Sequence, residues 1–457
     1  MSERKTIYLC LAHMSEEGYE QKYVKEAFDT NWVVPLGPNV NGFEIALEQF
    51  VNGSGNPRFD GMSEDCNIGK KVVALSSGTA AVHLALIACG VRPGDEVCVQ
   101  SFTFCASSHP ITYLGATPVF IDSEKDTWNM DPELLEKAIK DRIAKTGKKP
   151  KAIVPVALYG MPYKIDRIME IANKYDIPVV EDAAEGFGSK FKGQVLGTFG
   201  KYGVLSFNGN KMITTCGGGA LITPDEESWR EIMMYATQYR ESYPYYQHEK
   251  IGYNYRMSNI CAGIGRGQMT VANVHIAHHK HVQALYEKLL KDVDGINVHS
   301  QPKTGEYDSN YWLCTITIDP EVKIKGQENA YKTIVTGAVG GAAGVIHAAS
   351  SATTDCQPND NVEALRVAMD KAGIEARPVW KPMHCQPVYR QVGIENSELR
   401  IESLPNGNIR QTSDSSVAYV NGVSEAIFKA GICLPAGPMV TDEDVKYIVD
   451  TIKANIL

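Results

Sequence analysis

The residue best placed to do chemistry is Lys211, in the run SFNGNKMITTCGGG at residues 206–219. Asn208, Gly209 and Asn210 precede it and a glycine triplet follows it, and such turn formers keep the local backbone out of helix and sheet. A lysine in a solvated loop is ordinarily a surface charge. Its amine is also a nucleophile toward carbonyl groups, so the groups expected beside it decide between the two interpretations.

A carboxylate is expected at the end of an upstream strand. The run at residues 177–180, Ile-Pro-Val-Val, is typical of a buried parallel strand, and it delivers Glu181 and Asp182 at its carboxyl end. Ligands of open α/β sheets bind outside the carboxyl ends of the strands. Asp182 is therefore a candidate ligand-binding group, with an ordinary strand-end carboxylate as the alternative.

An anion site is expected in SSGTA at residues 76–80, which follows a strand-like run and opens a helical one. A helix start offers unpaired N–H groups and a partial positive charge, and Gly78 and Thr79 would bring the backbone close to a phosphate. Ser206 can add a hydroxyl to the same anion. The alternative for Ser-Gly-Thr alone is a helix cap.

A lysine amine, a strand-end carboxylate and an anion cradle are together what pyridoxal 5′-phosphate (PLP) requires. Lys211 would bind the cofactor aldehyde and move a proton, Asp182 would hold a proton on the pyridine nitrogen, and the cradle would hold the phosphate. We expect Lys211 and Asp182 to be catalytic.

Eight ordered motifs carry a family resemblance. They are SSGTAA, SFTF, FIDSEKDTWNMDPELLEKAI, LYG, EDAAE, GTFG, SFNGNKMITTCGGG and GYNYRMSN. From about Asn31 to about Met269, and again at residues 431–437, the chain resembles the sugar aminotransferases of the DegT/DnrJ/EryC1/StrS family. It is most similar to the bacillosamine-pathway type, which aminates UDP-4-keto-6-deoxy sugars. The resemblance implies an α/β protein of PLP-dependent aminotransferase fold type I.

The resemblance also assigns residues. It implies that Glu185 meets the phenolic oxygen of the cofactor and that Phe104 stacks on its ring, although a phenylalanine in such a place is often core packing. It implies that Asn254 reaches the phosphate of the neighbouring subunit, and hence a homodimer with composite active sites; a surface polar group is the alternative.

Substrate contacts are expected at the sugar end of the site. By resemblance these are Asn31, Pro35 and Leu36 in the N-terminal loop, and His384 in the tail. The chain departs from many relatives at Ala157, where they carry a histidine before Leu-Tyr-Gly. Any role of that histidine is absent here or supplied elsewhere.

The activity implied by the resemblance is transfer of an amino group from L-glutamate to C4 of a nucleotide-linked 4-keto-6-deoxy sugar. Amination at C3 is the nearest alternative. The related C3 dehydratases are disfavoured because they replace the lysine with histidine, and carbon–sulfur or carbon–carbon lyases lack the GYNYR and SFNGNK motifs. A sensor or scaffold that binds PLP without turnover is the alternative outside enzymes.

Composition excludes several other classes. The 457 residues carry a net charge of −9 with acidic and basic residues intermixed, which argues against a nucleic-acid partner. The eleven cysteines are scattered and form no C-x-x-C pair, which favours thiols in a reducing compartment. The N-terminus lacks the apolar core of a signal peptide and no run approaches membrane-spanning length. We expect a cytoplasmic protein.

Alternating strands and helices must position these residues. Between residues 70 and 223 we expect strands at 71–76, 95–100, 117–122, 151–157, 177–181, 202–206 and 219–223, and helices at 79–88, 104–114, 132–142 and 164–175. This βαβ order predicts a mostly parallel sheet covered on both faces. Asp131 and Pro132 are typical of a helix cap and first turn.

Two domains are expected from the length. Residues 1–272 would form the large PLP-binding α/β domain with an insertion at about 53–70. Residues 273–457 would form a smaller α+β domain with insertions at about 334–356 and 393–416. A helix capped by Ser258 or Asn259 would run to about Met269 and a longer one to about Leu290. Its histidines, at 275, 278, 279 and 281, are expected on a solvated face, and we expect no metal.

Overall fold

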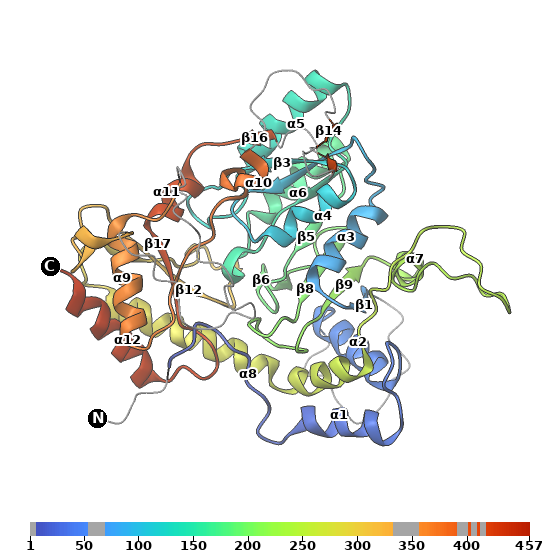
Figure 1. Cartoon of the computed structure of the whole chain (residues 1–457), viewed down its shortest axis with the longest axis horizontal. Coiled ribbons are helices and arrows are strands. Elements are labelled where there is room, and N and C mark those ends of the chain that lie inside the picture. The colour runs from blue at the N-terminus through green and yellow to red at the C-terminus, as the bar shows by residue number, and fades with distance from the viewer. Residues whose placement is uncertain (1–5, 54–68, 332–355, 391–400, 404–408, 412–416) are drawn as a thin grey trace.

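A computed structural model of the chain describes residues 6–53, 69–331, 356–390, 401–403, 409–411 and 417–457 (Figure 1). The helices are α1 Tyr19–Asp29, α2 Pro38–Val51, α3 Gly78–Ala88, α4 His109–Tyr113, α5 Pro132–Thr146, α6 Ile165–Tyr175, α7 Glu226–Ala236, α8 Asn259–Leu290, α9 Asp360–Lys371, α10 Pro387–Arg390, α11 Val423–Ala430 and α12 Asp442–Asn455.

The strands are β1 Lys71–Leu75, β2 Glu96–Gln100, β3 Thr117–Ile121, β4 Ala152–Val154, β5 Val180–Asp182, β6 Lys190–Phe191, β7 Gln194–Val195, β8 Tyr202–Ser206, β9 Gly219–Thr223, β10 Ile296–Val298, β11 Tyr307–Asp308, β12 Cys314–Ile318, β13 Arg377–Pro378, β14 Ile401–Ser403, β15 Ile409–Gln411, β16 Val417–Tyr419 and β17 Gly431–Leu434.

The main sheet has the order β16-β3-β2-β4 followed by β5-β8-β9-β1. Parallel bridges from Ile153 to Val179 and from Val156 to Asp182 join β4 to β5. Adjacent strands of this sheet are parallel, except that β9 is antiparallel to both β8 and β1. The predicted mostly parallel sheet is confirmed. Its parallel strands direct their carboxyl ends to one edge.

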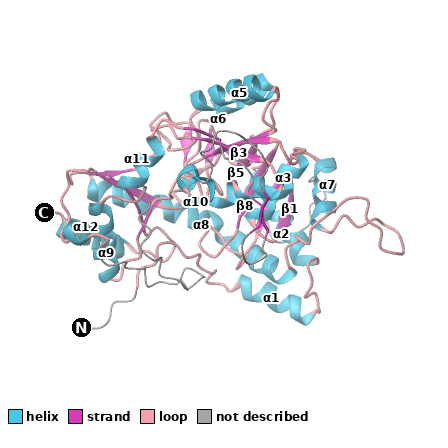
Figure 2. Ribbon diagram, turned by 45° about the horizontal axis from the view of Figure 1, so that its top comes forward, coloured by secondary structure: helices cyan, strands magenta, loops and turns pink. Residues whose placement is uncertain are grey.

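Alternation along the strands gives the sheet two apolar faces. In β1, Val72 and Ala74 belong to one core cluster, whereas Val73 and Leu75 belong to another. Helices α2, α5, α6 and α8 contribute to the first cluster, and α3, α4 and α7 contribute to the second. The result is a three-layer α/β/α arrangement (Figure 2).

Carboxylates of α2 satisfy the outer edge of β1. The backbone N–H of Ala74 donates to Glu44 over 2.7 Å, and that of Val72 donates to Glu48 over 3.0 Å. Arg256 pairs with Glu44 at 2.5 Å and also donates to the carbonyl oxygen of Ala74. An unpaired strand edge invites association with other strands, and here a helix closes it.

A second, antiparallel sheet has the order β10-β12-β17-β13. Its core includes Val282, Tyr286 and Leu290 of α8 together with apolar residues of α9 and α12. Figure 1 shows α8 running from beneath the main sheet to this smaller body. The helix is continuous and begins at the Ser258 cap, whose hydroxyl accepts from the Cys261 N–H at 3.1 Å. The domain boundary at 272/273 stays a prediction.

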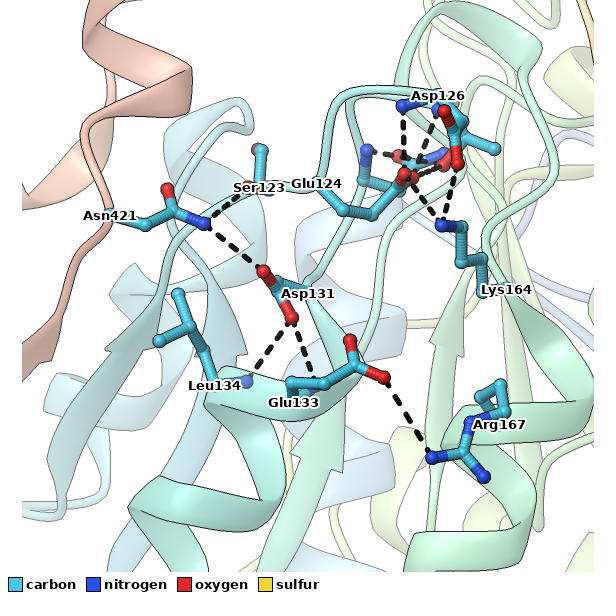
Figure 3. A network of polar contacts seen from close by, with 11 residues as sticks. Ser123, Glu124, Asp126, Asp131, Glu133, Leu134, Lys164, Arg167 and Asn421 are labelled. Carbon is cyan, nitrogen blue, oxygen red and sulfur yellow. Dashed lines mark hydrogen bonds and ion pairs between the residues drawn. The ribbon is translucent and has the colours of Figure 1, made fainter.

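The C-terminal part of the chain adds a strand to the main sheet, which the sequence did not indicate. Strand β16 pairs with β3 in parallel. After it, Asn421 donates to the carbonyl oxygen of Ser123 and to Asp131, each at 3.0 Å (Figure 3). Asp131 also accepts from the N–H groups of Glu133 and Leu134, so the predicted cap of α5 is confirmed.

Strands β14 and β15 lie in the predicted insertion at 393–416, whereas the insertions at 53–70 and 334–356 lie almost wholly outside the described residues.

Two predictions about helices were wrong. The helix expected at 104–114 is a short 3-10 turn at Cys105–Ser107 followed by α4, because Pro110 lacks an N–H and fits only a first helical turn. The histidine-bearing face of α8 is not solvated throughout. His275 and His279 are buried, because this stretch of the helix packs against the main body, whereas His281 is about half exposed and lies 2.8 Å from Asp442.

Within the described ranges, no helix has both the length and the apolar character needed to cross a membrane. No disulfide joins the cysteines that the structure describes.

Candidate active site

A cavity of about 260 Å³ lies at the carboxyl ends of β1, β5 and β8. Seven of the expected site residues line it: Gly78, Thr79, Phe104, Asp182, Glu185, Ser206 and Lys211. Strands that are distant in sequence end at the same edge of a parallel sheet, so the residues that follow them meet.

Lys211 points into this cavity rather than to the surface. Its side chain is 13% exposed, and its Nζ atom lies 3.4 Å from a Glu185 carboxylate oxygen and 4.0 Å from the ring centroid of Trp312. The interpretation of Lys211 as a surface charge is therefore wrong. Its amine stands between an acid and an aromatic face.

Asp182 is a buried carboxylate held from two sides. Ser107 donates its hydroxyl to one carboxylate oxygen at 2.6 Å, and the N–H of Ala184 donates to the other at 3.1 Å. Burial raises the pKa of Asp182, while the Ser107 hydrogen bond, the Ala184 hydrogen bond and the Lys211 charge oppose that rise. A cation placed against Asp182 would favour its charged form.

Glu185 is a second buried carboxylate of the cavity wall. One of its carboxylate oxygens accepts from the backbone N–H of Tyr159 at 2.7 Å and the other faces Lys211. Burial raises the pKa of Glu185, and the charge of Lys211 is the largest opposing effect. Ala157, where many relatives carry histidine, is buried against Gly186, where an added Cβ would lie 2.8 Å from the Ala157 methyl.

The anion cradle combines a helix start with a hydroxyl. Ser77 caps α3 by accepting from the Ala80 N–H at 3.0 Å, so the capping interpretation holds for that serine. At Gly78, a Cβ would lie 3.1 Å from Cβ of Ser206 and 3.3 Å from its Oγ. The first N–H groups of a helix have no acceptor within the helix, so α3 and Ser206 together offer donors to a phosphate.

Phe104 is 51% exposed and lies on the cavity wall. Its ring centroid is 5.8 Å from that of Trp380, which also lines the cavity. The core-packing interpretation is therefore wrong for Phe104. An exposed aromatic face beside Asp182 can cover a planar ring.

Five candidates do not line this cavity. Asn31, Pro35 and Leu36 are exposed in the loop before α2. Asn254 is exposed in the segment between α7 and α8, where it forms a backbone bridge with Thr237, the residue after α7. His384 instead contacts the Ser101 hydroxyl at 2.6 Å and Glu425 at 3.3 Å. The roles of these five residues stay predictions.

Sequence reasoning missed several residues of the wall: Ser107, Asn208, Asn210, Trp312 and Trp380. Ser107 follows the SFTF motif closely, and the two asparagines come just before Lys211, so their proximity in the sequence was a usable signal. The two tryptophans come from the tail and carry no local signal that would place them beside Lys211.

A possible cation site lies elsewhere. Cys356, Cys385 and Glu425 each offer a ligand atom, and these atoms lie within 4.8 Å of one another. Glu425 also contacts His384. Structural zinc sites take four protein ligands, so this group is incomplete within the part of the chain that the structure describes. The expectation of no metal stays a prediction.

The chemistry of the cavity fits PLP. A buried carboxylate can hold a pyridinium nitrogen, a helix start with Ser206 can hold a phosphate, and Lys211 stands between them with an aromatic residue on the wall. These donors are the ones that the sequence analysis expects for this cofactor.

Comparison with known proteins gives consistent results. The sequence profile of the DegT/DnrJ/EryC1/StrS aminotransferase family matches residues 14–334. The Bacillus subtilis (strain 168) protein EpsN, whose name provisionally describes a PLP-dependent aminotransferase, is 37% identical over 98% of this chain and 95% of that protein. The GDP-perosamine synthase of Escherichia coli O157:H7 is 30% identical over 97% of this chain and 98% of that protein.

Solved structures share the fold. A sugar aminotransferase from Streptococcus pneumoniae, Spr1654, also named provisionally, superposes with a TM-score of 0.74 over 98% of this chain and 97% of that one, at 24% identity. PseC of Helicobacter pylori superposes with a TM-score of 0.72 at 19% identity, over 98% and 99% of the two chains.

Proposed function

Because the chain belongs to the DegT/DnrJ/EryC1/StrS aminotransferase family, we propose that it transfers an amino group from L-glutamate to C4 of a nucleotide-linked 4-keto-6-deoxy sugar. The chain is a PLP-dependent aminotransferase. The sugar that we propose is UDP-linked 2-acetamido-2,6-dideoxy-4-keto-hexose, and its amination would serve surface glycan or glycoprotein synthesis. The observation that carries the proposal is the meeting of Lys211, Asp182, Glu185 and Ser206 in one cavity.

Each residue has a separate task in this proposal. PLP supplies an aldehyde that receives the amino group and a ring that takes up an electron pair. Asp182 holds a proton at the pyridine nitrogen, and Ser206 with the α3 N-terminus holds the phosphate. Phe104 covers the ring. Lys211 moves the proton, because its Nζ atom lies inside the cavity and has an acid, Glu185, at 3.4 Å.

The names of relatives support a nucleotide sugar as acceptor. They include GDP-perosamine synthases at 30% and 31% identity, and a UDP-2-acetamido-2-deoxy-3-oxo-D-glucuronate aminotransferase at 35% identity. Both GDP and UDP occur among them, and the choice of UDP for this chain follows the motif resemblance.

Amination at C3 is the second candidate. Two relatives whose names specify a 3-oxo or 3-dehydro sugar match 56% and 43% of this chain, whereas the perosamine synthases match 97% and 95%. The names of the perosamine synthases state no position of amination, so the choice of C4 over C3 in our proposal follows the motif resemblance.

We also propose a homodimer in which Asn254 completes the partner's site. Asn254 is exposed and does not line its own cavity. Its segment carries Tyr243, Tyr245 and Tyr246, which are 50%, 61% and 80% exposed. Aromatic side chains exposed together are typical of an interaction surface.

The test separates cofactor chemistry from sugar choice. Purified enzyme with L-glutamate should lose its visible absorbance band and release 2-oxoglutarate. It should then aminate one member of a panel of UDP-, dTDP- and GDP-linked keto sugars, with the position of the new amine read by NMR. Lys211→Ala should abolish both reactions.

Turnover of keto sugar by Lys211→Ala would refute the assigned lysine. A wild-type protein that binds PLP but does not react with L-glutamate or any keto sugar would instead favour the sensor or scaffold alternative.

A further inference from the structure

Trp312 contacts the lysine loop in two ways. The face of its indole lies 4.0 Å, measured to the ring centroid, from the Nζ atom of Lys211. Its Nε1–H donates to the carbonyl oxygen of Asn210, the residue just before the lysine, at 2.6 Å. Trp312 is 1% exposed. One buried side chain therefore contacts both the amine and the backbone that carries it.

The segment that carries Trp312 is fixed to the other partner of the amine. Asn310 donates from Nδ2 to the carbonyl oxygens of Glu185 and Phe187, both at 2.9 Å, and its Oδ1 accepts from the N–H of Trp312 at 2.8 Å. Glu185 is the acid 3.4 Å from Nζ of Lys211. The indole and the carboxylate on either side of the amine thus belong to one hydrogen-bonded unit.

The backbone before Trp312 is held in a costly conformation. Tyr311 has a φ of 50°, in the left-handed region that a side chain disfavours. The Nδ1 atom of buried His279 lies 3.1 Å from the Tyr311 carbonyl oxygen. One helical turn earlier, His275 holds the carbonyl oxygen of Met212, the residue after the lysine, at 3.3 Å. Such a conformation persists only where the surroundings fix it, so the orientation of the indole is specified from several directions.

We propose that Trp312 is a positioning residue for Lys211. Its indole face holds the amine when that amine is not bonded to another group, and its N–H fixes the loop, so that the free amine occupies one defined place in the cavity. A cation over a desolvated aromatic face is stabilised by the ring's electrostatic field. The proposal rests on the catalytic role proposed for Lys211.

Two substitutions separate the two contacts. Trp312→Phe keeps an aromatic face and removes the N–H donor, whereas Trp312→Leu removes both. The matched control is Trp380→Leu, which changes another tryptophan of the same cavity whose recorded ring contacts are with Phe104 and Tyr159.

The first measurement needs no turnover. Full-length protein freed of PLP is labelled with a trace of acetic anhydride, and the acetylation of Lys211 relative to the other lysines is measured by mass spectrometry. Because the indole face lies against the amine, labelling of Lys211 should rise roughly 2- to 30-fold in Trp312→Leu, from a cation–π loss of about 0.5–2 kcal/mol. The rise should be smaller in Trp312→Phe, and labelling should not change in Trp380→Leu.

The second measurement is kinetic. Both Trp312 variants should lower kcat about 10-fold with L-glutamate while KM changes less than about 2-fold, because the loop loses a fixed hydrogen bond and not a substrate contact. Unchanged labelling in a folded Trp312→Leu protein, or an equal rise in Trp380→Leu, would overturn the proposal. If Trp312→Leu does not fold, an unchanged kcat in Trp312→Phe overturns it. Labelling reports on the contact between the indole and the amine even if Lys211 proves to have no catalytic role. Failure of the positioning role of Trp312 is therefore distinguishable from failure of the catalytic role of Lys211.

Discussion

At the scale of single residues, the site gathers buried acids. Asp182 and Glu185 are both buried beside Lys211, and burial raises the pKa of each. A buried carboxylate destabilises the chain when it is charged and unpaired. A bound cation reverses that effect, so Asp182 should lower the stability of the cofactor-free chain and raise its affinity for PLP.

Asp182→Asn should raise the stability of the cofactor-free chain and lower its affinity for PLP. Because the folded-state pKa is raised above the ordinary value of 3.8, the contribution of Asp182 to stability is fully present below about pH 3.8 and is lost as pH rises through the raised pKa. At neutral pH the cofactor-free variant should therefore melt at a higher temperature than the wild type. Its Kd for PLP should rise roughly 10- to 100-fold, the loss of a hydrogen bond to a charged group.

Melting curves at pH 4 and pH 8, with and without PLP, measure the difference in melting temperature between Asp182→Asn and the wild type. The higher melting temperature of the variant should approach that of the wild type toward pH 4, and the difference should disappear when PLP is bound. The exposed residue Asp126, 64% exposed at its side chain, provides the control variant Asp126→Asn. An equal rise in the melting temperature of Asp182→Asn at both pH values would contradict the explanation that burial of the charged carboxylate destabilises the cofactor-free chain.

At the scale of elements, the cradle depends on how closely β9 approaches the start of α3. A Cβ added at Gly219, the first residue of β9, would lie 2.4 Å from the N atom of Gly78 and 2.4 Å from the carbonyl carbon of Ser77. These are backbone atoms, which cannot rotate away. The glycine after the lysine loop is therefore required by the position of the helix that would hold the phosphate.

Gly219→Ala should displace the α3 start. We expect a loss of unfolding free energy of about 1–3 kcal/mol, as for overpacked cores, and at least a roughly 10-fold weaker binding of PLP, because the helix N–H groups no longer converge with Ser206. Urea unfolding and PLP titration measure the two effects.

The matched control is Gly209→Ala in the same loop, where an added Cβ meets no atom within 4 Å. This variant should retain the stability of the wild type and bind PLP within about 2-fold of it. If Gly219→Ala behaved like Gly209→Ala, the close approach of β9 and α3 would not matter for the cofactor.

At the scale of the whole molecule, one chain gathers most of the candidate site residues but leaves others outside. Seven candidates line the cavity, whereas Asn254 is exposed outside it and Leu36 is 54% exposed. In a symmetric dimer, any residue that reaches the partner's cavity does so in both directions, because contacts across a two-fold interface are reciprocal. The composite site that we propose has a direct test.

Mixing Lys211→Ala with Asn254→Ala subunits should restore activity that neither variant has alone. In a mixed dimer, the subunit with Lys211 would receive Asn254 from its partner, so one of two sites is intact. After random exchange about half of the dimers are mixed, and activity should reach about a quarter of the wild-type value. Recovery is measured with L-glutamate and keto sugar after co-refolding, with size-exclusion chromatography and light scattering to establish the dimer. An absence of recovery in verified mixed dimers would place Asn254 in its own site or in none.

The sequence by itself determined the parallel sheet and the meeting of Lys211, Asp182, Ser206 and Gly78. Parallel strands end at one edge, so residues just after strand-like runs converge whatever the details of packing. Only the tertiary structure decided that Trp312 covers the amine. Its hydrogen bond reaches Asn210 across 102 residues, and no local periodicity encodes a contact between two separately folded segments. The same holds for the burial of His279 and for the tail strand β16, because burial depends on which surfaces pack together and not on the helix or strand that carries the residue.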